Sequence, residues 1–420
     1  MKLLIKQARI VDPTSPFHGQ RTDLLIENGI IQEIGNINAE AAEKVVTSND
    51  LCISPGWVDS FSNFADPGFE YKETLETGAE AAAAGGFTDV LIIPNTHPVI
   101  HNKAGVEYTL HKSRNLKTTI HPIGSVTRNA EGKELAEMYD MKSNGAVAFS
   151  DGLNCIQSSG LMIKALQYIK AFSGVLIQLP DDKTINPQGL INEGILSTQL
   201  GLPGKPAIGE ELMVARDIAL AEYAESKLHL TAVSTKNSIN LIAEAKSKKV
   251  AVSSAVTPYH LYFCDEDLQG YDTNLKVNPP LRGCEDRASL QEAVRNGIVD
   301  CIASHHLPHE TDSKVIEFEY AQYGMIGLET TYAVLNTSVN GLTPERTVEL
   351  LSSNPRKIFN LHIPTIAVGK EARLTLFDPS VEWTLTKSDL RSRSSNSPFI
   401  GKRLKGKVIG TIHPNATTLL

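Results

Sequence analysis

Short apolar runs recur between residues 57 and 305, each bounded by turn or polar residues and followed by a segment with helical spacing. The runs cover residues 57–63, 87–94, 118–125, 145–151, 174–179, 228–233, 250–256 and 299–305. Helical spacing is clear over residues 72–85, 158–171, 208–227 and 286–296. Near-continuous apolar strands are typical of parallel sheets that are buried on both faces. Eight such units predict an α/β fold with a (β/α)8 TIM barrel, and a doubly wound sheet is the alternative.

Both ends of the chain read as β-structure instead. Residues 2–10 alternate between apolar and polar, and Asn28-Gly29 lies between two apolar runs, which indicates a type I′ hairpin. Residues 372–377 and 406–412 also read as strands. We therefore expect residues 1–54 and 363–420 to form one accessory β-sandwich domain, with the barrel over residues 55–362.

Composition narrows the classes of protein. Of 420 residues, 41% are hydrophobic and 21% are charged, and 40 basic against 48 acidic residues give a net charge of −8. This is ordinary for a soluble globular enzyme, and neither nucleic acid nor a membrane is an expected partner. With no secretory signal and no stretch of 18 apolar residues, the sequence predicts a cytoplasmic protein. The scattered cysteines argue against a disulfide framework or a zinc knuckle; they are Cys52, Cys155, Cys264, Cys284 and Cys301.

Catalytic groups of a (β/α)8 barrel sit at the carboxyl ends of its strands. In this chain those ends carry residues 59–63, Asn95, Asp151, Leu179, Ala232 and His305. Neighbouring strand residues face opposite ways, so His305 and His306 are not expected to line the mouth together.

Longer stretches resemble the dihydroorotases of bacteria and of multifunctional pyrimidine complexes, which are members of the amidohydrolase superfamily. The similarity covers nearly the whole chain and includes PGWVD at 55–59, PGFEYKETLETG at 67–78, IPNTHPV at 93–99 and YDTNLKVNPPLR at 271–282. The resemblance implies interconversion of carbamoyl aspartate and dihydroorotate, a cyclic amide, in pyrimidine biosynthesis. It also implies one or two zinc ions that activate water at neutral pH.

The metal-binding pattern of that family is largely absent. Phe61, Asn63 and Ala65 stand where the family has H-x-H-x-R, Leu179 and Ala232 replace two histidines, and His305 replaces the carboxylate that acts as general base. Only Asp151 keeps a ligand type, at the bridging position, and an Asp-Gly pair is also an ordinary turn. Phe, Leu and Ala offer no donor atoms, so we expect no bound metal and no cofactor.

Other positions match residues that contact dihydroorotate in the family: Asn95, Asn278 and His309, with Tyr323 and Gly324 as a backbone clamp. These residues predict a pocket that is still shaped for a small polar ring. The alternative is that Asn95 caps a loop and that Asn278 with its two prolines forms a rigid turn.

Three hypotheses follow. The favoured one is a non-catalytic dihydroorotase homologue, a pseudoenzyme that works as a homodimer or larger homo-oligomer and as a scaffold for aspartate carbamoyltransferase, the role that the resemblance implies for degenerate homologues. The second is an active dihydroorotase, allantoinase or hydantoinase with an atypical site. The third is a protein that only binds a small molecule.

Overall fold

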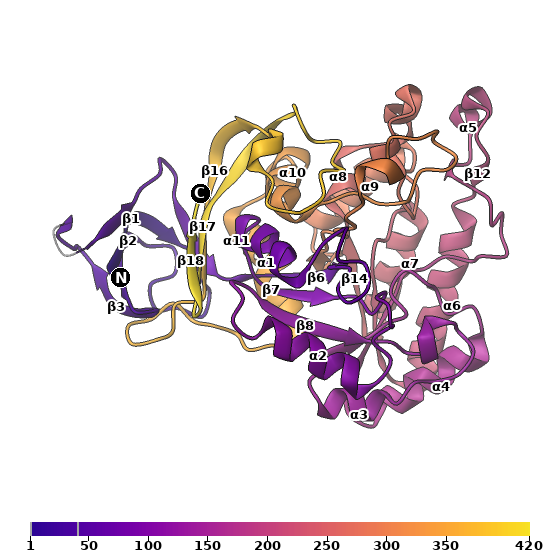
Figure 1. Cartoon of the computed structure of the whole chain (residues 1–420), viewed down its shortest axis with the longest axis horizontal. Coiled ribbons are helices and arrows are strands. Elements are labelled where there is room, and N and C mark those ends of the chain that lie inside the picture. The colour runs from indigo at the N-terminus through magenta and orange to yellow at the C-terminus, as the bar shows by residue number, and fades with distance from the viewer. Residues whose placement is uncertain (1, 40–41) are drawn as a thin grey trace.

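The centre of the molecule is a parallel sheet that closes almost completely into a barrel (Figure 1). A computed structural model describes residues 2–39 and 42–420 of the chain. The eight barrel strands follow one another around the sheet in chain order: β6 (Trp57–Ser62), β7 (Phe87–Ile92), β8 (Thr119–Gly124), β9 (Ala148–Phe149), β10 (Val175–Gln178), β13 (Lys227–Leu230), β14 (Val252–Val256) and β15 (Cys301–Ile302). Each lies within one of the predicted apolar runs, except that β13 begins one residue earlier. The predicted barrel is confirmed, and the doubly wound sheet is wrong.

Polar groups close the seam between the first and the last strand. Ser62 and His306 form a parallel β-bridge, and the backbone N–H of Asn63 donates to the carbonyl of His306 at 2.9 Å. The buried carboxylate of Asp59 accepts hydrogen bonds from the N–H and the hydroxyl of Ser304, at 2.6 and 2.9 Å. Burial raises the pKa of Asp59. Asp59 therefore stabilises the barrel closure and does not reach the mouth.

Helices cover the outside of the barrel, and several begin at a capping side chain (Figure 1). Thr74, Ser158 and Thr235 accept from the N–H three residues later and start three of them. The helices are α1 (Leu75–Ala84), α2 (Lys103–Ser113), α3 (Met138–Ser143), α4 (Ser159–Lys170), α6 (Ile208–Ala224), α7 (Lys236–Ser247), α8 (Pro258–Tyr262), α9 (Cys284–Arg295), α10 (Thr331–Ser338), α11 (Pro344–Val348) and α12 (Asn354–Ile358). Helix α5 (Ile195–Leu200), with β11 (Ile191–Asn192) and β12 (Gly204–Lys205), forms an excursion before α6.

The two termini build a second sheet beside the barrel. Its strands are β1 (Lys2–Ile10), β2 (Arg21–Glu27), β3 (Ile30–Gly35), β4 (Lys44–Val46), β5 (Cys52–Pro55), β16 (Leu374–Thr384), β17 (Arg403–His413) and β18 (Ala416–Leu419). Asn28 and Gly29 join β2 to β3 with φ of 49° and 76°, as the type I′ prediction requires. Met1 and residues 40–41 of the predicted module lie outside the described residues. The exact division at residues 54 and 363 stays a proposal.

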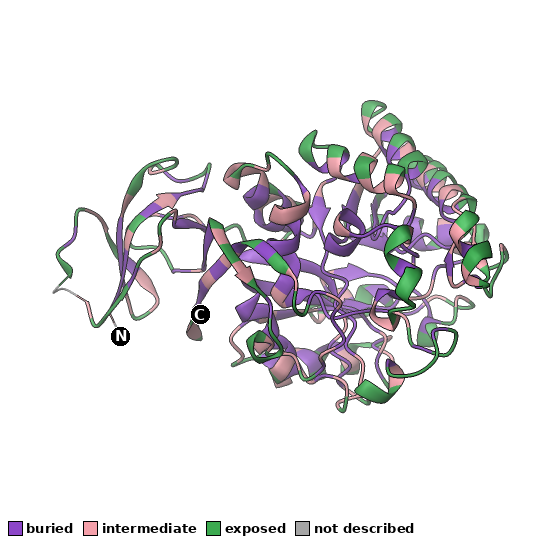
Figure 2. Ribbon diagram, turned by 90° about the horizontal axis from the view of Figure 1, so that it is seen from above, coloured by how far each residue is buried: buried purple, intermediate pink, exposed green. Residues whose placement is uncertain are grey.

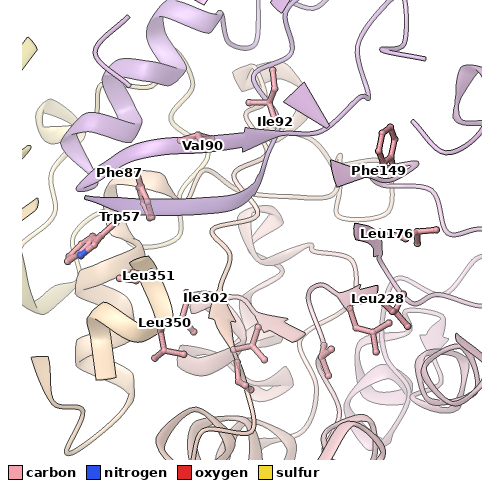
Figure 3. Close-up of a cluster of buried hydrophobic side chains, with 14 of the residues drawn as sticks. Trp57, Phe87, Val90, Ile92, Phe149, Leu176, Leu228, Ile302, Leu350 and Leu351 are labelled. Carbon is pink, nitrogen blue, oxygen red and sulfur yellow. The ribbon is translucent and has the colours of Figure 1, made fainter. Parts of the chain in front are cut away.

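Apolar side chains join the two bodies. Figure 3 shows part of the cluster between the barrel strands and the helices, with Trp57 at its edge. The Trp57 ring lies 5.3 Å from that of Phe377 in β16 and 5.0 Å from that of Tyr332 in α10. Seven of the ten residues of α1 are buried, because β17 packs over this helix and Thr411 donates to the carbonyl of Ala83. The helical spacing over residues 72–85 predicted this helix but not its burial on nearly all sides, which the sheet of the termini explains. Figure 2 shows buried residues filling the barrel and exposed ones on the outer helices.

A buried ion cluster stands at the amino end of the barrel. The carboxylate of Asp89 in β7 accepts from Arg356 of α12 at 2.6 Å and from Arg373, ahead of β16, at 3.1 Å. His121 of β8 lies 3.0 Å from the same carboxylate. Burial alone would raise the pKa of Asp89, but the charge of Arg356, the hydrogen bond with His121 and the charge of Arg373 hold it well below its usual range. The cluster thus ties two strands, the last barrel helix and the accessory sheet to one carboxylate.

One expectation from the cysteines is wrong. Cys264 and Cys284 form a disulfide across 20 residues, at either end of the segment that contains Asn278. Cys52, Cys155 and Cys301 are free and buried. Sequence spacing gave no signal for this pair, because only the return of the chain after α8 brings the two residues together.

Across residues 2–39 and 42–420, no helix combines the length and the apolar character that crossing a bilayer requires.

The Asp89 cluster predicts the effect of one substitution. Asp89→Asn leaves Arg356 buried without its counter-charge, so we expect the free energy of unfolding to fall by about 3–5 kcal/mol. Chemical denaturation followed by circular dichroism measures this. Glu80→Gln is the control, because it removes the half-exposed pair with Lys117 and should change stability by less than about 1 kcal/mol. Equal effects of the two substitutions would contradict the assignment.

Candidate functional site

A cavity of about 340 Å³ opens at the carboxyl ends of the barrel strands. It collects residues that lie far apart in the sequence: Asn63, Ala65, Phe69, Lys72, Asn95, Leu153, Leu179, Asn278, Leu307, Pro308, His309, Gln322 and Tyr323. Asn95, Asn278, His309 and Tyr323, which the sequence pointed to as ligand contacts, share this cavity, whereas Gly324 is not part of its lining. Parallel closure explains the grouping, because it brings all the strand ends to one rim.

Two stacked rings fill the barrel beneath this cavity. The rings of Phe61 and His305 lie 4.3 Å apart at 18°, and both side chains are buried. The Nε2 atom of His305 is 2.7 Å from the hydroxyl oxygen of Thr231. Burial, together with neighbouring His260 and His229, lowers the pKa of His305 to about 3. His305 is therefore neutral, held from the side by Thr231 and covered by an aromatic ring.

The remaining positions of the expected metal centre do not supply converging donors. Leu179 lines the cavity, and Ala232 is fully buried. The carboxylate of Asp151 accepts from the N–H of Thr127 at 2.8 Å and from its hydroxyl, and it is absent from the cavity lining. Burial raises the pKa of Asp151 to about 6 against these hydrogen bonds. In the described part of the chain, three His, Cys, Asp or Glu side chains converge only at Cys264, Glu266 and Cys284, which do not line the cavity and of which the two cysteines form the disulfide. The residues at the mouth do not fit the zinc centre that the resemblance implies.

Both asparagines are bound to the protein as well as exposed to the cavity. Asn95 donates to the carbonyl of Asp151 at 3.2 Å and accepts from the N–H of Leu153 at 3.1 Å. Asn278 accepts from Lys205 at 2.7 Å and donates to Asp181 at 3.3 Å. These contacts agree with the interpretation that Asn95 caps a loop. Both Asn95 and Asn278 also line the cavity.

His309 lines the cavity and has one ring nitrogen without a partner among the described residues. Its Nε2 lies 2.9 Å from the carbonyl oxygen of Tyr323, so the ring proton must be on Nε2. Its buried Nδ1 has no hydrogen-bond partner within the described residues. Burial and the charge of Lys72 lower the pKa of His309 to about 4. At neutral pH, the Nδ1 atom of His309 is thus unprotonated, buried and without a hydrogen-bond partner among the described residues.

Two buried lysines shape the wall that carries Tyr323 and Gly324. Lys314 donates to the carbonyls of Gln322 and Gly324, and Lys276 donates to those of Phe318 and Glu319. Burial, with the charge of Lys276, lowers the pKa of Lys314 to about 7. Gly324 has a φ of 118°, and a Cβ there would lie 2.5 Å from Leu307. The carbonyls of the predicted backbone clamp are therefore already bound within the chain, that of Tyr323 by His309 and that of Gly324 by Lys314.

Sequence reasoning missed Lys72 and its neighbour Glu73. Lys72 lines the cavity, its ammonium lies 5.6 Å from the centre of the Phe69 ring, and no carboxylate of the described residues is within ion-pair distance of it. Glu73 is buried and contacts His306 at 3.2 Å, the N–H of Arg393 at 3.0 Å and the hydroxyl of Ser392. Both residues belong to the stretch PGFEYKETLETG, which pointed to a family but to no role for either side chain.

Comparison with known proteins finds two family models, close to full-length relatives and solved structures that match this chain. A model described as Dihydro-orotase-like matches residues 51–238, and one described as Amidohydrolase family matches residues 192–413. A protein named dihydroorotase from Syntrophus aciditrophicus is 41% identical over 417 residues, which is 98% of each chain. A protein of the same name from Pelotomaculum thermopropionicum is 40% identical to this chain, and the match covers 98% of this chain and 97% of the relative. The solved L-hydantoinase (dihydropyrimidinase) from Arthrobacter aurescens superposes with a TM-score of 0.84 at 24% identity, over 99% of this chain and 95% of its own.

The state of His309 can be tested directly. We expect nitrogen-15 NMR of histidine-labelled protein to show His309 as the Nε2–H tautomer, neutral until the pH falls to about 4, because burial disfavours its charged form. His309→Gln identifies the signal. Titration of that signal near the ordinary value of 6.5 would show that the ring is solvated and that Nδ1 is not held for a ligand.

Proposed function

This chain belongs to the dihydroorotase family, and on that premise we propose that its barrel mouth binds a small cyclic amide without hydrolysing it through a metal-activated water. The observation that carries the proposal is the stack of Phe61 on His305. In the proteins that the chain resembles, these two positions hold a metal ligand and the general base. Here they form one buried contact between rings.

Hydrolysis of a cyclic amide in this family depends on a metal that lowers the pKa of bound water. The supporting observation is chemical: Phe61, Leu179 and Ala232 have no donor atom, and an Asn63 amide is a poor zinc ligand. Asp151 is directed to Thr127. A single carboxylate with a committed hydrogen-bond partner is a weak basis for metal binding, since even the loss of an outer hydrogen-bond partner lowers affinity about 10 to 100-fold.

The proposal also rests on the absence of a well-placed general base among the cavity residues. A general base must come within about 3 Å of the proton that it removes. His305 is absent from the cavity lining and covered by Phe61, and its Nε2 lies against Thr231. His309 does line the cavity, but it serves as a hydrogen-bond acceptor of low basicity because its pKa is about 4.

The side chains that line the cavity support the binding of a small ring. The cavity wall combines apolar Phe69, Leu153 and Leu307 with the imidazole of His309 and the side chain of Lys72. A cyclic amide has an N–H that can donate to His309 and an apolar ring edge. A carboxylate on that ring would face Lys72 instead of an arginine at position 65.

The assembly partner is a separate proposal. The role as a scaffold for aspartate carbamoyltransferase rests on the family resemblance, and no contact in the structure identifies that partner. Co-purification from the native cells, followed by a transcarbamoylase assay, tests it.

Metal content and turnover test the main proposal. We expect protein prepared without chelator to carry less than stoichiometric zinc, and to interconvert carbamoyl aspartate and dihydroorotate far below about 1 per second, because the mouth lacks both a metal hydroxide and a base. Elemental analysis and a coupled assay measure these. One or two metal ions per chain together with turnover at ordinary rates would establish the alternative, an active enzyme with an atypical site.

Ligand binding gives an independent test. Without an arginine at position 65 we expect dihydroorotate to bind more weakly than micromolar, since a charge-assisted hydrogen bond contributes about 1.5–3 kcal/mol. Calorimetry of the parent protein, of Ala65→Arg and of Ala65→Gln compares no added charge, an added charge and a neutral side chain of similar length. Tighter binding by the arginine variant alone supports a carboxylate at this position. Micromolar binding by the parent protein would contradict the expectation.

A further inference from the structure

Two loops at the carboxyl end of the barrel carry large apolar side chains on the outside of the molecule. They are residues 265–275, between α8 and α9, and residues 310–322, which follow β15. The exposed fractions are 45%, 78%, 43% and 68%, in the order Tyr271, Val315, Ile316 and Tyr320. Single exposed apolar residues are common on proteins, but a group of four in two loops marks a candidate contact surface.

Contacts within the chain hold the two loops side by side. The hydroxyl of Thr273 donates to the carbonyl of Lys314, and the rings of Tyr271 and Phe318 lie 6.5 Å apart. The ammonium of Lys276 donates to the carbonyl of Phe318 at 2.9 Å. Tyr271 therefore lies beside the loop that carries the other three apolar residues, and the surface is already formed in the free protein.

Carboxylates surround these apolar side chains, and among the residues that the structure describes none of them forms an ion pair. The six that are exposed are Glu266, Asp267, Asp272, Asp312, Glu317 and Glu319. The basic residues of positions 265–276 and 310–322 are Lys276 and Lys314, which are both buried with their ammonium groups on backbone carbonyls. The outer surface of the two loops is therefore apolar and negative.

Some of these carboxylates also have a structural role. Asp267 accepts from the N–H of Cys264 and Asp272 from that of Asn274, each at 2.9 Å, so these two side chains cap turns. This role does not account for the four apolar side chains, because a loop that is only solvated gains no stability by exposing them.

We infer that these four apolar side chains and six carboxylates, which we call the loop patch, bind a protein segment in which lysine or arginine side chains flank apolar ones. Complementary potentials steer partners and select among them. A second copy would set its own carboxylates against the loop patch, and nucleic acid or an anionic membrane would bring phosphates to it, so charge disfavours all three. A basic amphipathic helix has the required chemistry. This contact is independent of what the cavity binds.

Both parts of the loop patch contribute to the expected affinity. Val315 and Tyr320 supply apolar area to bury, and the carboxylates add an attraction that salt screens. One segment on two loops buries an area at the low end for stable complexes. We therefore expect a dissociation constant on the order of micromolar, which rises about tenfold or more between about 0.05 and 0.5 M salt.

A synthetic peptide tests the charge of the partner. The probe is a fluorescent helix of about 18 residues with leucine on one face and lysine along its edges, and fluorescence anisotropy measures its binding to the whole chain. We expect Asp312→Lys combined with Glu317→Lys to weaken binding about tenfold or more. Glu33→Lys combined with Glu107→Lys is the control, because both residues are exposed outside the loop patch and the net charge changes equally. The control should weaken binding less than about twofold.

A second pair of variants tests the apolar part. We expect Val315→Ser to weaken binding of the same peptide about fivefold, because it removes apolar area from the contact. Val368→Ser, at a residue 54% exposed outside the loop patch, should leave binding unchanged. Thermal unfolding should be the same for all these variants, which separates lost binding from lost folding. Equal effects of the test and control variants, or equally tight binding of a peptide with glutamate in place of lysine, would overturn the inference.

Cross-linking in the native cells identifies the occupant. Benzoylphenylalanine at position 315 should cross-link on illumination to a segment that has more Lys and Arg than Asp and Glu, and the same group at position 368 should not. Mass spectrometry of the cross-linked peptide gives its sequence. A second copy of this chain, a neutral or acidic segment, or no cross-link at position 315 would each contradict the assignment of a basic protein partner.

Discussion

The carboxylate of Asp89 sets the constraint on which the rest of the structure depends. A buried charge is tolerated only when it is paired and hydrogen-bonded. Arg356, Arg373 and His121 must therefore reach Asp89 together, and they come from the last barrel helix, the segment before the accessory sheet and a neighbouring strand. Satisfying one carboxylate thus fixes where the barrel begins and how the second sheet docks on it. In such barrels the amino end serves stability, and the carboxyl end is free to vary.

The carboxyl end shows how that freedom has been used. The cavity wall keeps amide, imidazole and ammonium groups, while the barrel beneath it is closed by Phe61 and His305. Stacked rings in a core gain dispersion and apolar burial where a metal centre would need donors and charge. The mouth therefore has the geometry of a binding cavity and an apolar floor.

Much of the fold follows from local patterns, but little of the site chemistry does. The eight strands and the Asn28-Gly29 hairpin were readable because a short apolar run between turn residues and a turn preference are both local signals of a few residues. The roles of Asp59 and Glu73 were not readable, because their partners, Ser304 and Ser392, lie more than 200 residues away. The disulfide and the buried face of α1 depend likewise on long-range packing. For the cavity, the sequence pointed to Asn95, Asn278 and His309, whereas Lys72 appeared only once the strand ends were brought together.

The sheet of the termini also bears on how the chain is made. Strand β5 pairs on one side with β1 and on the other with β16, in the register Leu374 to Pro55. At a synthesis rate of about 5–20 residues per second, the second neighbour leaves the ribosome on the order of half a minute after the first. Through that interval, β5 presents an unpaired edge and the apolar side of the N-terminal strands has no cover, which is the situation that favours wrong pairing between nascent chains. Folding of this module is therefore completed only after nearly the whole chain has been synthesised. Its N-terminal strands are the segment for which protection by molecular chaperones matters most.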